Sequence, residues 1–250
     1  MVIINGGKVF MNITTEIKTY FKNVKDLDIN FDNAEITYLK QGKTNKSYLL
    51  DFTNFRLVLR INADNSSDLG INRVNEEIIL NALDGISVSP KIIYCDESYK
   101  YLIYEYVEGY NLDIKKITKK NKKTLTDLIL RYQSVDINLP KFDYCAYLSK
   151  YLDLLKKQNK DKKFDSEKLE SFLMDLEKFQ KADWIPKLVH HDLVTNIIKT
   201  NNSFKILDWE YAGNGFPSFD YHSLGISPNN DPFIEQLINI LNNFWYEITN

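Results

Sequence analysis

The chain has 250 residues, 44% hydrophobic and 13% aromatic, which is enough for one large globular domain or two small lobes. Its 32 basic and 34 acidic residues give a net charge of −2, which argues against a nucleic-acid-binding surface. No apolar run approaches the roughly 18 residues that cross a bilayer. No signal peptide is visible, and Cys95 and Cys145 lack metal or redox spacing. We therefore expect a soluble, cytoplasmic protein without membrane insertion; its oligomeric state does not follow from these numbers.

The N-terminal part of the chain predicts a helix followed by a sheet. Apolar residues at helical spacing predict a helix over residues 12–25. Runs rich in β-branched and aromatic residues, separated by turn residues, then predict five strands. They lie within residues 36–39, 47–52, 55–61, 86–95 and 101–109.

The turn between the first two strands carries small and polar residues, among them Gly42, Thr44 and Asn45. Backbone N–H groups and short side chains in such a turn approach phosphate oxygens closely. An ordinary hairpin turn has the same composition, so the turn by itself leaves both interpretations open.

Arg60 lies in a strand whose other residues suit burial, Phe55 to Ile61. A buried guanidinium is costly unless an anion meets it. We therefore expect an anionic partner for Arg60. The alternative is an exposed charge on an edge strand.

From Asn111 the sequence predicts mainly helices, the last of them over residues 232–248. Six lysines fall between Lys115 and Lys123, and we interpret them as a solvated helix end, because no aromatic residues alternate with them. The helical region is interrupted by a hairpin within residues 188–211. Its first loop carries His190, Asp192 and Asn196, and its return strand ends in Asp208-Trp209-Glu210.

Side chains alternate along a strand, so the hairpin predicts Asp208 and Glu210 on one face and Trp209 on the other. Carboxylates and a carboxamide at one end of a hairpin suit a hard cation such as Mg²⁺. The alternative is a polar hairpin rim with its charges in water.

One motif resembles the choline kinase and aminoglycoside phosphotransferase families: His190-x-Asp192, followed by Asn196 and by Ile206-Leu-Asp-Trp-Glu-Tyr211. Within these families the pattern is most similar to LicA-type choline kinases and to thiamine kinase. The resemblance implies an α+β, two-lobed, protein-kinase-like fold. Its N-terminal nucleotide-binding lobe, residues 1–108, would hold a five-stranded antiparallel sheet plus a helix. Its catalytic and substrate lobe, residues 109–250, would be mainly helical with a catalytic β-hairpin.

The resemblance also implies roles for the hairpin residues. Asp192 would be the catalytic base and His190 would brace its loop. Asn196 and Asp208 would hold Mg²⁺, and Glu210 would reach a second metal through water. The family pattern has four residues between the Asp and the Asn, whereas this chain has three, which leaves open whether Asn196 reaches the metal.

On the nucleotide side, residues 42–48 resemble the Gly-x-Thr-Asn-x-x-Tyr segment of choline kinases, which implies that Gly42, Thr44 and Asn45 approach the ATP phosphates. In kinase-like folds a cation at the position of Arg60 pairs with the phosphates and with an acid on the next helix. The segment Ile71-Asn72-Arg73-x-x-Glu76 resembles the family and makes Glu76 the expected partner, with Glu77 as the alternative. The backbone from Glu105 to Val107 would bond the adenine edge.

The expected acceptor is a small amino alcohol, choline first, then thiamine or ethanolamine. Aromatic faces attract a quaternary ammonium group. The aromatic residues near the site in sequence are Trp209, Tyr211, Phe219, Tyr221, Trp245 and Tyr246. We take Trp209, Tyr211 and Trp245 as substrate residues, although core packing explains aromatic residues equally well. Asp220 follows a short loop, where these families keep an acid that braces the catalytic loop, and we include it on the substrate side.

Three alternatives to such a kinase remain. The shortened catalytic loop is compatible with an inactive kinase-like module that binds nucleotide or a partner. An aminoglycoside phosphotransferase-like enzyme fits the motif but usually has a markedly acidic cleft. A protein kinase is disfavoured, because no Ala-Pro-Glu-like anchor follows Asp208.

Overall fold

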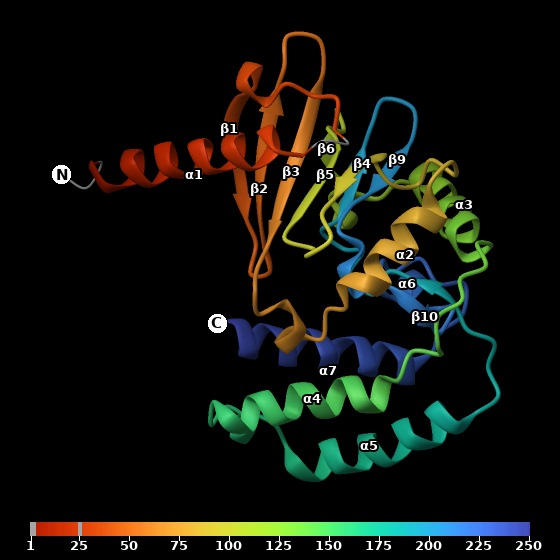
Figure 1. The fold of residues 1–250 in the computed structure, drawn as a ribbon. Helices are drawn as coiled ribbons and strands as arrows, with labels where there is room; N and C mark the ends of the chain where they lie inside the picture. Colours follow the sequence, from red (N-terminus) through yellow and green to blue (C-terminus); the bar gives the residue numbers. More distant parts are fainter. Residues whose placement is uncertain (1–3, 25–26) are drawn as a thin grey trace. The chain divides into compact units, whose positions relative to one another are not determined.

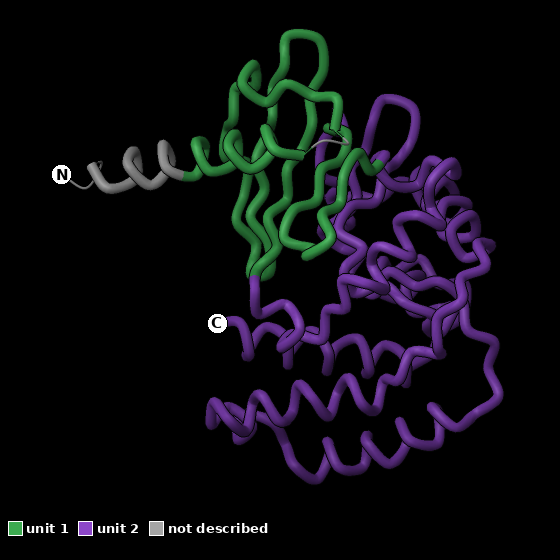
Figure 2. Tube along the Cα trace, in the orientation of Figure 1, with its two compact units in different colours: residues 1–63, 92–106 green, residues 64–91, 107–250 purple. Residues whose placement is uncertain are grey.

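A computed structural model describes residues 4–24 and 27–250. The chain divides into two compact units (Figure 2). The first contains Met1–Ala63 and Ile92–Tyr106, and the second contains Asp64–Lys91 and Val107–Asn250. The functional division at residue 108, with nucleotide binding before it and catalysis after it, stays a prediction.

The first unit is built on a five-stranded antiparallel sheet in the order β1-β2-β3-β5-β4. The strands are β1 Glu35–Gln41, β2 Asn45–Asp51, β3 Arg56–Asn62, β4 Ile92–Cys95 and β5 Tyr101–Glu105. The predicted sheet is therefore confirmed. Ile17 and Phe21 of the N-terminal helix join a hydrophobic cluster with sheet residues such as Leu50, Leu59 and Ile103.

That helix, α1, spans Ile4–Lys22. The expected start at residue 12 is wrong, because the helix continues through Gly6 and Gly7. Glycine lowers helix stability by about 1 kcal/mol per residue relative to alanine, which is why the sequence predicted a later start. The expected end at residue 25 lies outside the described residues, and the regular helix ends three residues earlier.

The second unit is mainly helical, as expected. Its helices are α2 Arg73–Leu83, α3 Lys119–Gln133, α4 Tyr144–Lys157, α5 Ser166–Lys181, α6 Phe219–Ser223 and α7 Pro232–Thr249. Helix α4 packs against both α5 and α7 (Figure 1). Asp143, Asp165 and Asp231 cap α4, α5 and α7, each accepting a hydrogen bond from a backbone N–H of the first turn. Among the described residues, no helix has the length and apolar character that crossing a membrane requires.

Short strands complete the second unit. Strands β8 Ile197–Lys199 and β9 Phe204–Ile206 form the predicted hairpin, with Ile197 opposite Ile206, and β6 Tyr110–Asn111 pairs with β8. A second pair, β7 Lys187–Val189 with β10 Gly213–Gly215, was not expected, because a Gly-Asn-Gly sequence has low strand propensity.

The end of the hairpin differs from the prediction. Strand β9 ends at Ile206, Asp208 has a left-handed backbone with φ 62°, and Trp209–Tyr211 form a turn of 3-10 helix. The strand alternation expected for residues 208–210 is therefore wrong. The left-handed residue turns the chain out of the strand, so that Trp209 and Glu210 are both buried.

Candidate active site

The buried carboxylate of Asp220 holds the backbone of the predicted catalytic loop. It accepts hydrogen bonds from the backbone N–H of His190 (2.7 Å) and of His191 (3.1 Å), and from the hydroxyl of Tyr132 in α3 (2.6 Å). Burial raises the pKa of Asp220, and the three donors oppose that rise by stabilising the charged form. The loop backbone is thus fixed to helices α3 and α6.

His190 connects this loop to the hairpin. Its Nε2 lies 2.9 Å from the carbonyl oxygen of Leu207, which only accepts, so Nε2 carries the proton. Its Nδ1 then accepts from the backbone N–H of Asp192, at 3.2 Å. Burial lowers the pKa of His190, consistent with a neutral ring. The ring therefore fixes the backbone on both sides of the site.

Asn196 lies beside Asp192 despite the shortened loop. Its side-chain amide donates to the backbone carbonyl of Asp192 at 2.8 Å and to the carboxylate Oδ2 at 3.0 Å. The carbonyl of Asn196 also accepts from the backbone N–H of Leu207, at 2.8 Å, and Asp208 follows directly. Asp192, Asn196 and Asp208 are thus gathered at one end of the β8–β9 hairpin.

These residues fit a divalent cation with oxygen ligands. Asn196 offers Oδ1 on the acceptor side of its amide, and Asp208 offers a carboxylate. Within residues 4–24 and 27–250, no three His, Cys, Asp or Glu side chains form a metal-binding cluster of their own. Mg²⁺ in kinases is typically bound by one or two protein groups together with substrate phosphates, so a sparse donor set suits it.

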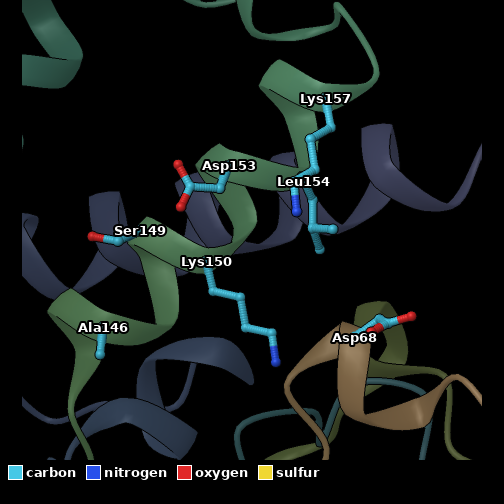
Figure 3. A pocket seen from close by; sticks show the side chains of 7 residues that line it. All are labelled: Asp68, Ala146, Ser149, Lys150, Asp153, Leu154 and Lys157. Atoms are coloured by element: carbon cyan, nitrogen blue, oxygen red, sulfur yellow. The ribbon is translucent and has the colours of Figure 1, made fainter.

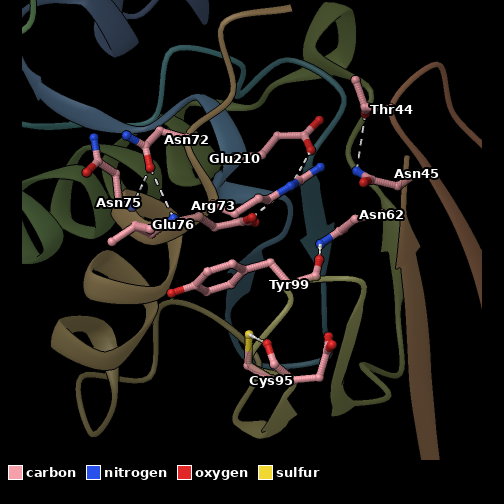
Figure 4. A network of polar contacts seen from close by, with 12 residues as sticks. Thr44, Asn45, Asn62, Asn72, Arg73, Asn75, Glu76, Cys95, Tyr99 and Glu210 are labelled. Atoms are coloured by element: carbon pink, nitrogen blue, oxygen red, sulfur yellow. Dashed lines mark hydrogen bonds and ion pairs between the residues drawn. The ribbon is translucent and has the colours of Figure 1, made fainter. Parts of the chain in front are cut away.

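Glu76 and Glu210 share a guanidinium. Arg73 Nη1 lies 2.7 Å from Glu76 Oε2 in α2 and 2.8 Å from Glu210 Oε2 in the 3-10 turn, and both carboxylates are buried (Figure 4). The Asn72 side chain caps α2 at this point by accepting from two backbone N–H groups. The predicted partnership of Glu76 with Arg60, and of Glu210 with a second metal, both stay predictions.

The predicted nucleotide residues lie in the first unit, apart from Glu76 and Val107. The turn between β1 and β2 is closed by a bond from the Gly42 N–H to the Asn45 carbonyl (2.9 Å), and the Asn45 amide donates to the Thr44 hydroxyl at 3.2 Å (Figure 4). Arg60 is buried in β3, an inner strand, which excludes the exposed edge-strand alternative. Glu105 is the last residue of β5.

An aromatic pocket of about 490 Å³ opens beside the catalytic loop. Its walls come from the loop, from α4 and the residue Phe142 before it, from Tyr211, and from α6 and α7. They include Phe142, Tyr147, Tyr151, His191, Asp192, Leu193, Val194, Thr195, Tyr211, Phe219, Ser223, Ile238, Leu241, Asn242 and Trp245.

The pocket is neutral apart from Asp192. Tyr147 and Tyr151 share a hydrogen bond of 2.8 Å, and the Trp245 indole N–H donates to the Tyr211 hydroxyl at 3.0 Å. Burial raises the pKa of all three tyrosines, so their hydroxyls stay protonated. Aromatic faces therefore surround one carboxylate.

Of the four predicted substrate residues, Tyr211 and Trp245 line this pocket, whereas Trp209 and Asp220 do not. Trp209 packs edge-on against Tyr132 and His190, with ring centroids 5.3 and 4.7 Å away. Trp209 and Asp220 are both buried and do not face the cavity.

Comparisons with known proteins agree with this geometry. The sequence profile of the choline/ethanolamine kinase family matches residues 36–224. This chain belongs to that family. It is therefore a choline/ethanolamine kinase-like small-molecule kinase, as the hairpin motif predicted.

Individual relatives and solved structures are similar to this kinase in sequence or in fold. It is 28% identical over 183 residues to the LicA homologue of Mycoplasma capricolum subsp. capricolum, covering 73% of this chain and 68% of the relative. Its fold matches a Plasmodium vivax ethanolamine kinase with a TM-score of 0.72 and 19% identity, over 99% of this chain and 80% of the other. The choline kinase LicA from Streptococcus pneumoniae matches with a TM-score of 0.70 and 20% identity, over 92% and 80%. The protein-kinase-like fold is thus confirmed.

A second cavity of the kinase has a different character. It has about 370 Å³ and lies between α4 and the 3-10 turn Ser66–Leu69 (Figure 3). Its lining mixes basic and acidic side chains, among them Lys150, Lys157, Asp68 and Asp153, and contains no aromatic residue. It therefore lacks the faces that attract a quaternary ammonium group.

Sequence reasoning missed several residues of the candidate site. Tyr147 and Tyr151 are spaced four apart on α4, a pattern that core packing also produces. Arg73 lies within the family-like segment 71–76, in which Glu76 alone was predicted as a site residue. His191 was missed because it stands between the two motif residues His190 and Asp192.

The neutral state of His191 predicts a pH-dependent stability. Burial lowers its pKa from 6.5 to about 3. Between these values the unfolded chain binds a proton at His191 that the folded chain does not bind. The stability that the neutral ring contributes is therefore complete above pH 6.5 and is lost as the pH falls. We expect the free energy of unfolding to decrease by up to about 1.4 kcal/mol per pH unit for this proton.

Urea unfolding at pH 7, 6, 5 and 4.5 measures that slope. His191→Asn removes the titrating ring, and asparagine tolerates the left-handed backbone (φ 67°) of this position. The variant should show a shallower loss than the wild type. Equal slopes would show that His191 titrates alike in both states.

Proposed function

We propose that this kinase transfers the γ-phosphate of ATP to the hydroxyl of choline. The observation that carries the proposal is the aromatic pocket with Asp192 in its wall. A quaternary ammonium group is attracted to aromatic faces by about 0.5–2 kcal/mol per contact. An acceptor held there would present its hydroxyl to the predicted base.

Each residue then has a task in phosphoryl transfer, which depends on positioning and charge neutralisation. Asp192 accepts the proton of the acceptor hydroxyl or orients that hydroxyl, and Asn196 holds the carboxylate through its 3.0 Å bond. Asn196 and Asp208 would hold Mg²⁺, which supplies positive charge to the ATP phosphates. The buried guanidinium of Arg60 would add to that charge.

The pocket favours choline over ethanolamine. A primary ammonium group has three N–H donors that need acceptors, whereas a trimethylammonium group has none. Among the lining residues, the hydroxyls of Tyr147, Tyr151 and Tyr211 take part in hydrogen bonds with one another or with Trp245. Ethanolamine would therefore depend on the other acceptors of the lining, Asp192, Thr195, Ser223 and Asn242, whereas choline would need none of them.

An ADP-release assay tests the proposal. Purified protein is given ATP, with and without Mg²⁺, and choline, ethanolamine, thiamine or an aminoglycoside in turn. We expect Mg²⁺-dependent release that is highest with choline. Nucleotide binding without transfer to any acceptor would support an inactive binding module instead, and transfer only to an aminoglycoside would support that enzyme class.

Trp245 gives the pocket a specific test. Trp245→Leu should raise the KM for choline about 2- to 30-fold, because one cation–π contact of 0.5–2 kcal/mol is lost. The KM for ATP should not change. Tyr246→Leu is the matched control, since Tyr246 is the next residue of α7, is 60% exposed and does not line the pocket. An unchanged KM for choline in Trp245→Leu would remove this ring from the acceptor site.

A further inference from the structure

His191 occupies a strained position next to the predicted base. Its φ of 67° lies in the left-handed region, which a residue with a side chain adopts only when its surroundings impose it. Its Nδ1 lies 3.0 Å from the carbonyl oxygen of Tyr211, so Nδ1 carries the proton, and its Nε2 lies 3.0 Å from the Tyr144 hydroxyl. Nε2 is therefore the acceptor, and Tyr144 donates.

The Tyr144 hydroxyl has a second contact. It accepts from the backbone N–H of Phe216 at 2.9 Å. The hydroxyl thus links α4, the segment after Tyr211 and the catalytic loop. The His191 ring also lies 4.3 Å from the ring of Phe142, at 35°, and both rings line the acceptor pocket.

Gly215 leaves the space that this bond needs. A Cβ atom at Gly215 would lie 2.6 Å from the Tyr144 hydroxyl and 2.7 Å from His191 Nε2. Both distances are shorter than any ordinary contact. Glycine is therefore required here for the two side chains to meet.

We propose that His191 and Tyr144 form a positioning pair that sets the Asp192 carboxylate against the wall of the acceptor pocket. The pair rests on the proposed function, since it positions the base for that reaction. His191 precedes Asp192 in the chain and packs on Phe142 in the pocket wall. A shift of the imidazole therefore moves the base and the acceptor surface relative to one another.

The kinetic test uses Tyr144→Phe, which keeps the ring and removes the hydroxyl. We expect kcat with choline to fall about 10- to 100-fold, because a displacement of about 1 Å can cost that much, while the KM for ATP stays unchanged. His191→Asn should show a similar fall, and the double variant should be no worse than the poorer single variant, because both remove one interaction. Gly215→Ala should show the same defect through steric conflict.

A matched control separates positioning from a general loss of stability. Tyr20→Phe removes a hydroxyl that lies 3.4 Å from the Tyr94 hydroxyl in the first unit, and it should keep the wild-type kcat. Additive effects of Tyr144→Phe and His191→Asn would contradict the pair. So would an unchanged kcat in Tyr144→Phe.

A second readout does not depend on turnover. Nitrogen-15 NMR of the folded wild type should show His191 as a neutral ring protonated at Nδ1 at pH 6–8. A ring protonated at Nε2 would overturn the pair even if the enzyme phosphorylates choline. Wild-type protein with the expected ring but without choline-dependent ADP release would contradict the proposed function, and with it the role of the pair. Active wild type with unaffected variants contradicts the pair alone.

Discussion

Asp192→Asn should lower the kcat for choline phosphorylation by about 10²- to 10⁴-fold, the usual contribution of a general base. The carboxamide has nearly the same shape as the carboxylate but does not accept the hydroxyl proton. It keeps an oxygen for the Asn196 amide, which lies 3.0 Å from Oδ2 in the wild type. The loop should therefore keep its conformation, and thermal unfolding should change little.

The measurement is ADP release at saturating choline and ATP, together with the melting temperature. Asp127→Asn is the matched control, because Asp127 is an exposed residue of α3 that pairs with Lys123. It should keep wild-type turnover. If Asp192→Asn retained a kcat within threefold of the wild type, another group would have to activate the hydroxyl.

Arg73→Met should reduce the free energy of unfolding by about 3–5 kcal/mol, the usual cost of removing one partner from a buried ion pair. Arg73 contacts both Glu76 and Glu210, and all three side chains are at most 9% exposed. Methionine retains much of the side-chain volume, so the loss arises mainly from two buried carboxylates that lose their shared cation. The carboxylates of Glu76 and Glu210 then repel each other in a buried region of low dielectric constant.

Urea denaturation at pH 7 measures this loss. Lys178→Met removes a cation from a pair with Asp175 on α5, where the side chains are 78% and 56% exposed, and should cost less than about 1 kcal/mol. Equal effects of the two substitutions would show that the Arg73 pairs are not stabilised by burial. Glu210→Gln in the Arg73→Met background should recover part of the loss, since it removes one of the two charges.

The fold was largely predictable because its elements follow strong local patterns. The five strands of the sheet and the β8–β9 hairpin were all expected from alternating apolar runs and turn residues. The failures have physical causes. Gly6 and Gly7 disfavour a helix that nevertheless forms, and the left-handed Asp208 ends a strand that its apolar and aromatic sequence would continue.

The site was predictable where its residues are consecutive or fall in one motif. Asn196 lies against Asp192, and its backbone pairs with Leu207, the residue before Asp208, while the catalytic and metal-binding roles of these residues stay predictions. The pocket walls were not predictable, because Tyr147 of α4, Trp245 of α7 and Phe142, which precedes α4, meet through a packing of helices that the sequence does not reveal. The pairing of Arg73 with Glu210 likewise joins residues 137 positions apart, a contact that only the tertiary structure specifies.

Two sets of hydrogen bonds fix the catalytic loop on either side of its shortened span, and we call them its anchors. Upstream, Asp220 holds the backbone at His190 and His191, and downstream the Leu207 N–H holds Asn196. Only residues 193–195 lie between Asp192 and Asn196. The shortened span therefore lies between two anchored points, which is how three intervening residues still bring Asn196 beside Asp192.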